Sequence, residues 1–207
     1  MNYEFDVPDG VEVVTDSCDE VKASYRGLWI KITLNRDDDM GPPWEEHDGH
    51  GPVSEWTSRD KRPGERVLSS HWHGDNPSRR YYDVEEATEI AKRDGWGIHP
   101  DSVDDYDSLT RGQIVAKAVE NDFKFLKGWC NDEWYWIWYG LVVEDEDGEE
   151  IHESSLGGID DWGYAVEEAL SEAVSEIDSH LEEVETQKHA AWVKEVTDEL
   201  QYSYVSY

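Results

Sequence analysis

The sequence is poor in basic residues, and this shortage is its most unusual feature. Its 207 residues include 18 Lys and Arg against 50 Asp and Glu, which gives a formal net charge of −32. Between Lys127 and Lys188 there is no Lys or Arg at all. A surface of this charge repels phosphate, so we expect no direct binding of nucleic acid and expect a basic protein as partner.

Cysteine and long apolar runs are also scarce. Only Cys18 and Cys130 are present, which is too few for a disulfide scaffold and suits a reducing compartment. No apolar run approaches the roughly 20 residues that span a bilayer, and the start of the chain lacks the basic-then-apolar pattern of a signal peptide. We therefore expect a cytoplasmic protein that makes no contact with a membrane.

Motifs for nucleotide binding and nucleophilic catalysis are missing as well. The chain has no P-loop, no G-x-G-x-x-G and no G-x-S-x-G, and neither cysteine has an adjacent basic residue to activate the thiol. We therefore expect no catalytic residues, no enzyme activity and no cofactor.

Aromatic residues, in contrast, are abundant. The chain holds 11 Trp, 11 Tyr and 3 Phe, and disordered acidic chains carry few such residues because they lack the apolar surface that offsets chain entropy. The acidity therefore belongs to a folded protein. The length fits a single domain over residues 1–207.

Apolar periodicity predicts both strands and helices. Residues 25–35 alternate apolar and polar side chains, which predicts a half-buried strand, and residues 65–73 predict another. Residues 36–64 are rich in Pro, Gly and charge and show no periodicity, which predicts a long loop. We expect Trp44 and Trp56 to anchor this loop.

Capping patterns mark two helices. Asp83 is followed three residues later by Glu86, and the apolar spacing that begins there stops near Gly95. Thr110 and Gln113 repeat the same arrangement and begin a second helical pattern. These patterns predict two helices of ordinary length.

The most aromatic stretch of the chain predicts a β-hairpin. Its strands are expected at residues 133–144 and 149–159, joined by a turn at Asp147 and Gly148. Alternation along the first strand predicts one face with Trp134, Trp136 and Trp138, and another with Tyr135, Ile137 and Tyr139. We predict an α+β fold: a small antiparallel or mixed sheet, two or three helices and a long acidic C-terminal helix.

That C-terminal helix is expected over residues 164–200, with a break near residues 186–189 left open. Eleven acids fall within 33 residues from Glu167 to Glu199. In a helix they would occur about once per 4.5 Å, comparable to the charge every 3.4 Å along one DNA strand. The acids that we expect to bind the partner are those of the hairpin and the helix: Glu144, Asp145, Glu146, Asp147, Glu149, Glu150, Glu167, Glu168, Glu172, Glu176, Glu182 and Glu183.

Other accounts of these residues stay open. The acidity could serve only solubility, or reflect an origin in concentrated salt. The basic cluster from Arg59 to Arg80 is expected to pair with the protein's own acids or with those of a second copy in a homodimer. A metal site is the alternative function, because histidines two apart on a strand point the same way. Its ligands would be His47, Asp48, His50, His71 and His73.

Several segments resemble a known group of proteins. The strings PWEEHDGHGPVSEW, RDKRPGERVL, RRYYD, EIAKRDGWG and GWCNDEWYWIWYGLVVEDEDGEE occur in this order within residues 25–165. They resemble a family of uncharacterised acidic proteins encoded by bacteriophages and mobile elements. The resemblance supplies no catalytic residues. By analogy with DNA mimics from such genomes, it implies an inhibitor of a host defence nuclease or effector complex, of the anti-restriction or anti-CRISPR type.

Overall fold

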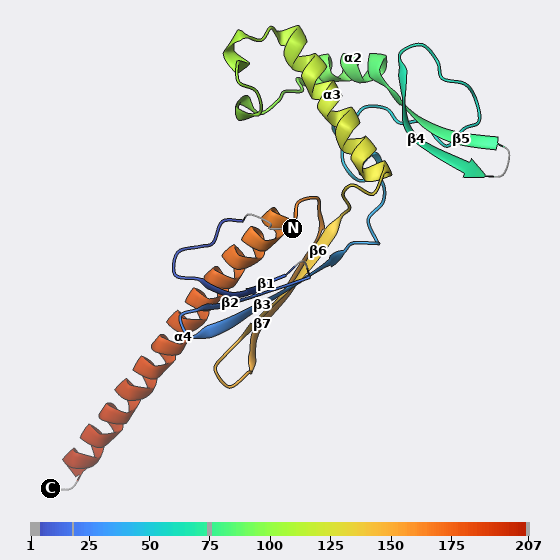
Figure 1. Cartoon of the computed structure of the whole chain (residues 1–207). Helices are drawn as coiled ribbons and strands as arrows, with labels where there is room; N and C mark the ends of the chain where they lie inside the picture. The colour runs from blue at the N-terminus through green and yellow to red at the C-terminus, as the bar shows by residue number, and fades with distance from the viewer. Residues whose placement is uncertain (1–4, 18, 74–75, 206–207) are drawn as a thin grey trace. The chain divides into compact units, whose positions relative to one another are not determined.

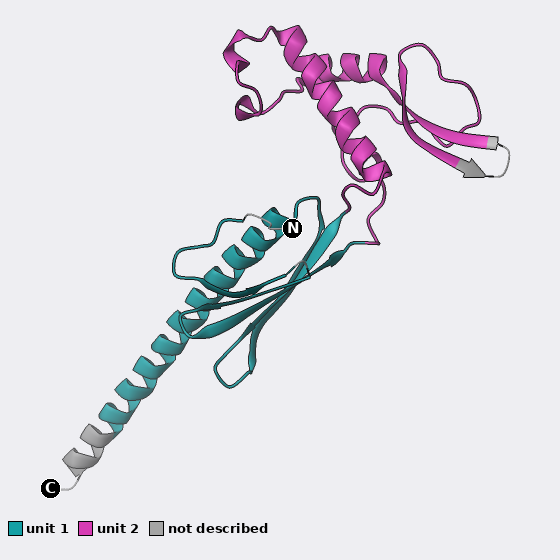
Figure 2. Ribbon diagram, viewed as in Figure 1, with its two compact units in different colours: residues 1–37, 136–207 teal, residues 38–135 magenta. Residues whose placement is uncertain are grey.

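The computed structural model describes residues 5–17, 19–73 and 76–205, without the side chains of residues 72, 73, 76 and 199–205. Contacts divide the chain into two compact units (Figure 2): unit 1 is residues 1–37 with 136–207, and unit 2 is residues 38–135. We expected a single domain. The division arises because the chain leaves the first sheet after Asp37, builds a second core and returns at Trp136.

Unit 1 is built on a five-stranded antiparallel sheet with the order β1-β2-β3-β6-β7 (Figure 1). Its strands are β1 (Glu12–Asp16), β2 (Glu20–Tyr25), β3 (Leu28–Arg36), β6 (Ile137–Glu144) and β7 (Glu150–Ile159). β3 pairs with β6 from Trp29 opposite Glu144 to Arg36 opposite Ile137. The segments before and after unit 2 therefore meet in the sheet.

The strand predicted at residues 25–35 is confirmed as β3. Leu28, Ile30, Ile32 and Leu34 are buried, and Trp29 between the first two is 44% exposed. The strand begins at Leu28 because Arg26 and Gly27 form a tight turn after β2. Both have positive φ, 52° and 89°, as a two-residue type I′ hairpin turn requires. β1 and β2 were not predicted, since their sequences are mostly polar.

Helix α4 (Trp162–Val205) lies on this sheet through its first half. The side chains that it buries there include Ala165, Val166, Ala169, Leu170, Ala173 and Ile177. After Ile177 no described side chain of α4 is fully buried, and Trp192 is 58% exposed. The helix runs without a break through residues 186–189 and projects past the end of the sheet (Figure 1).

The predicted hairpin is confirmed as β6 and β7, but its first strand starts later than expected. Trp134 and Tyr135 belong to unit 2, where the indole N–H of Trp134 donates to the backbone oxygen of Phe125 at 2.8 Å. Alternation therefore begins only at Ile137, and the adjacent Trp136 is buried too. Trp134, Trp136 and Trp138 do not form one strand face, because the first two precede the strand.

Unit 2 combines a two-stranded sheet with helices. The sheet pairs β4 (Glu65–His73) with β5 (Asn76–Asp83), and the α-helices are α1 (Pro43–Glu46), α2 (Val84–Asp94) and α3 (Arg111–Cys130). Two short 3₁₀ turns, Pro100–Ser102 and Tyr106–Ser108, connect α2 to α3. Both predicted helix starts are confirmed: the side chains of Asp83 and Thr110 accept hydrogen bonds from the amides of Glu86 and Gln113.

The long loop expected at residues 36–64 contains one helical turn, α1, and two isolated bridges to β5, at Val53 and Thr57. Trp44 packs its ring edge-on against Trp129, with 5.5 Å between the ring centroids. The guanidinium of Arg80 lies 4.8 Å from the ring of Trp44 and 5.0 Å from that of Trp56. The two tryptophans therefore hold the loop partly through one arginine of β5.

These elements confirm the predicted α+β class, with an antiparallel sheet and a long C-terminal helix. Among the described residues, no helix combines the length and the apolar character needed to cross a membrane.

Candidate functional site

The acids of α4 lie beside and opposite the face that packs on the sheet. At 100° per residue, Glu168 and Glu182 fall opposite the buried face. Glu167, Asp178 and Glu185 fall along one flank, and Glu172, Glu176 and Glu183 along the other. The helix therefore carries three rows of carboxylates: one along each flank of the buried face, and one opposite it.

On the flank beside β7, the carboxylates of α4 have partners within unit 1. Glu172 accepts hydrogen bonds from the hydroxyl of Tyr139 at 2.9 Å and from Nε2 of His152 at 3.1 Å, and Glu176 lies 3.7 Å from Nδ1 of His152. Burial raises the pKa of Glu172, but hydrogen bonds and the nearby imidazole outweigh it, so the pKa is lowered overall. Burial and the carboxylate of Glu172 raise the pKa of Tyr139.

The opposite flank holds the N-terminal part of the chain. Asp178 accepts from the guanidinium of Arg26 at 2.7 Å and from the hydroxyl of Tyr25 at 3.4 Å. Glu167 accepts the backbone N–H of Asp6 at 2.7 Å. The acids on both flanks thus fasten α4 to its own unit before any partner is considered.

The acids at the tip of the hairpin also fall into two groups: those with partners in unit 1 and those that are exposed. Asp145 accepts the backbone N–H groups of Asp147 and Glu149, which fixes the turn, and Glu144 forms an ion pair with Lys31 at 2.6 Å. The remaining acids of the tip are exposed: Glu146, Asp147, Glu149 and Glu150. The tip lies at the end of the sheet from which α4 projects (Figure 1).

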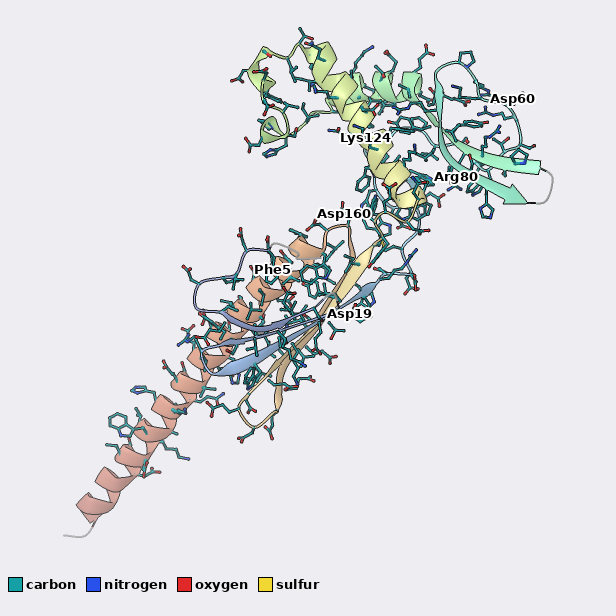
Figure 3. The ribbon with its side chains drawn as sticks, in the orientation of Figure 1. Phe5, Asp19, Asp60, Arg80, Lys124 and Asp160 are labelled. Atoms are coloured by element: carbon teal, nitrogen blue, oxygen red, sulfur yellow. The ribbon has the colours of Figure 1, made fainter. Side chains whose placement is uncertain are left out.

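The twelve predicted partner-binding residues therefore fall into two groups. Five have partners inside unit 1: Glu144, Asp145, Glu167, Glu172 and Glu176. Seven are exposed, and these we call the open carboxylates: Glu146, Asp147, Glu149, Glu150, Glu168, Glu182 and Glu183. Among them, Glu183 accepts a hydrogen bond from the side-chain amide of Gln187, one turn further along α4, at 3.1 Å. Side chains of the projecting part of α4 stand clear of the sheet (Figure 3). The sequence could not separate the two groups fully, because most of the partners, such as Lys31 for Glu144, come from segments distant in the chain.

The alternative metal ligands are not assembled where the structure describes them. His47 and Asp48 are exposed, His71 lies near the ring of Trp56, and the side chain of His73 is outside the described residues. Within the described part of the chain, no three or more His, Cys, Asp or Glu side chains are grouped to hold a metal ion. His50 is engaged with an aspartate instead.

That aspartate, Asp122 of α3, is the centre of a buried polar cluster in unit 2. One carboxylate oxygen lies 2.6 Å from Nδ1 of His50, and the other accepts from the amide of Gly51 at 2.8 Å and the hydroxyl of Tyr82 at 2.6 Å. Burial, and then the hydrogen bond to Asp122, raise the pKa of Tyr82. The cluster ties the long loop to α3 and β5.

No pattern in the sequence predicted this cluster. Asp122 stands 72 residues from His50 and 40 from Tyr82, so no local motif connects them. One signal was available: Asp122 lies four residues from both Ala118 and Leu126 on the apolar side of a predicted helix. Comparison of the chain with family models, curated proteins and solved structures gives no match.

Proposed function

We propose that unit 1 is a DNA mimic that occupies the basic nucleic-acid-binding surface of another protein. The observation that carries this proposal is the set of open carboxylates on a continuous helix and an adjacent hairpin tip, in a unit with 6 Lys and Arg against 28 Asp and Glu. All carboxylates of this set are exposed, and exposed charged contacts contribute little to stability.

The spacing of the charges supports the proposal. Exposed acids extend along α4 from Glu168 to Asp198, which is about 45 Å at the rise of an α-helix. A rod of that length with charge on several sides resembles the outline of a short duplex, which carries charge along two backbones. The hairpin tip supplies further charge beside the helix.

The partner is proposed by its chemistry. A groove lined with Lys and Arg, shaped for a nucleic acid backbone, would replace its phosphate contacts with carboxylate contacts. The resemblance to acidic proteins of phages and mobile elements points to a host defence nuclease as the class of target. Restriction and CRISPR nucleases are the proteins to test first.

The test compares two triple variants with equal change in charge. The first reverses Glu168, Glu182 and Glu183 to Lys on α4. The matched control reverses Asp104, Asp105 and Asp107 to Lys in the exposed connection between α2 and α3 of unit 2. Both have the same net charge, so a difference between them reports the position of the charge and not its total.

Binding to a purified panel of such nucleases is measured with and without competing DNA. We expect the α4 variant to lose about 100-fold in affinity, at about 1 kcal/mol for each charge contact, and the control to lose far less. Wild-type binding should weaken with salt and compete with DNA. Equal loss in both variants, or simultaneous binding of DNA and protein, would contradict the proposal.

A further inference from the structure

Unit 2 contains a cavity beside the polar cluster of Asp122, and the proposed mimicry makes no use of it. Its volume is about 400 Å³, within the range of small-molecule sites. The lining residues include Trp96, Phe125 and Ala118, together with the polar residues His50, Asn121 and Asp122. An apolar lining with few polar groups suits a small ring compound more than an ion.

His50 is held in one orientation at this cavity. Its Nδ1 lies 2.6 Å from Asp122, and its ring stacks on Phe125 with 5.6 Å between centroids and 11° between planes. The carboxylate of Asp122 is already shared with the amide of Gly51 and the hydroxyl of Tyr82. A carboxylate can only accept, so Nδ1 carries the hydrogen of this contact, and in the neutral imidazole Nε2 is then an acceptor.

Nε2 of His50 has no hydrogen-bond partner among the described residues. The side chain of His50 is 17% exposed, and Nε2 does not belong to the buried side-chain atoms without a partner, so it is open to solvent or to a ligand. The structural role of the cluster, tying the loop to α3, requires only Nδ1. Nε2 is therefore available to a ligand.

We propose that this cavity binds a small planar ring compound that carries an N–H or O–H donor at its edge. The ring lies among Trp96, Phe125 and the His50 imidazole, and the donor hydrogen-bonds to Nε2 of His50. Asp122 is a positioning residue, since its oxygens are occupied. The carboxylate of Asp122, which lines the cavity, favours a neutral or cationic ring over an anion.

Three small aromatic probes separate the parts of this proposal: phenol, toluene and benzoate. Phenol offers a ring with a donor, toluene a ring without one, and benzoate a ring with an anion. Each is titrated into the full chain while the amide signals of Gly49 and Gly97 are followed by NMR. We expect saturable binding of phenol, about three- to tenfold weaker binding of toluene, as one net hydrogen bond gives, and the weakest binding for benzoate.

Two variants locate the site. Gly97 lines the cavity, and Gly97→Leu adds a side chain there without backbone strain, since a Cβ at Gly97 meets nothing within 4 Å and the residue has no positive φ. Its control is Gly112→Leu, at a glycine of α3 that is equally open but away from the cavity. We expect the first to weaken both phenol and toluene at least tenfold, and the second to change neither.

The second variant, His50→Phe, keeps a ring against Phe125 but removes the acceptor. It should abolish the preference for phenol over toluene. If His50→Phe fails to fold, the comparison of Gly97→Leu with Gly112→Leu still tests the proposal. The proposal is overturned if Gly97→Leu binds phenol as wild type does, if wild type binds toluene as well as phenol, or if benzoate binds most tightly. Shifts that never saturate would also overturn it.

Discussion

Unit 1 holds 28 Asp and Glu with 6 Lys and Arg, whereas unit 2 holds 22 with 12, so their formal charges are −22 and −10. The units also use their acids differently. In unit 2, Glu65 is buried and accepts from the guanidinium of Arg59 and the amide of Arg62, and Asp122 organises the cluster around His50. In unit 1, the open carboxylates are all exposed, and none of them is buried as Glu65 is.

This difference shows why composition alone is a poor guide to an acidic surface. A carboxylate that already accepts hydrogen bonds from its own fold has little left to offer a partner, and removing it harms the fold. An exposed carboxylate contributes little to stability and is available for binding. Four measurements test the contrast, from the largest expected effect to the smallest.

The largest effect is expected at the buried acid of unit 2. Glu65→Ala leaves the guanidinium of Arg59 and the amide of Arg62 without their acceptor. We expect a loss of about 3 kcal/mol in the free energy of unfolding, at the lower end for one partner of a buried ion pair. Chemical denaturation followed by circular dichroism gives the value. The control, Glu168→Ala on α4, should change stability by less than about 0.5 kcal/mol. Equal effects would remove the contrast between the units.

The second measurement follows the contribution of Glu65 to the free energy of unfolding as the pH changes. Hydrogen bonds from the guanidinium of Arg59 lower the pKa of Glu65 from its ordinary 4.5 to about 2. A lowered pKa means that its contribution to stability is complete above pH 4.5 and is lost as the pH falls towards 2. The stability difference between wild type and Glu65→Gln should therefore shrink over this interval. A difference that stays constant down to pH 2 would contradict the assignment.

A smaller effect is expected from Tyr82→Phe, which removes one donor to Asp122 and keeps the buried ring. Because the amide of Gly51 still bonds to the same oxygen, we expect a loss of about 1 kcal/mol in the free energy of unfolding. Tyr164→Phe is the matched control in unit 1, at a side chain that is 53% exposed, and should be neutral. An unchanged stability for both variants would mean that the Asp122 cluster contributes nothing to unit 2.

The smallest effect is expected from salt. Raising it from roughly 0.01 M to 1 M shortens the Debye length from about 30 Å to about 3 Å and screens repulsion among like charges. The free energy of opening, measured by hydrogen exchange, should then rise in unit 1 by less than about 1 kcal/mol. It should rise less in unit 2, where charges of both signs are mixed. A unit 1 that unfolds without molar salt would favour adaptation to concentrated salt over mimicry.

Part of this structure could be predicted from the sequence, because it depends on interactions between residues that are close in the chain. The strand at Leu28 to Leu34 follows from alternation, and the helix starts at Asp83 and Thr110 follow from side chains that satisfy amides three residues away. The length of α4 follows from apolar spacing sustained over residues 164–200. Each of these signals acts between neighbours in the chain, so no knowledge of the fold was needed.

Contacts between distant segments decided the rest. The chain closes the sheet of unit 1 only after 98 intervening residues, so the two units could not be recognised from local patterns. Which carboxylates are occupied depends on strands far from them in sequence, as with Glu172 and Tyr139 or Asp178 and Arg26. The charge of the surface is therefore a property of the sequence, whereas its availability to a partner is set by tertiary hydrogen bonds, because only folding brings donor and carboxylate within bonding distance.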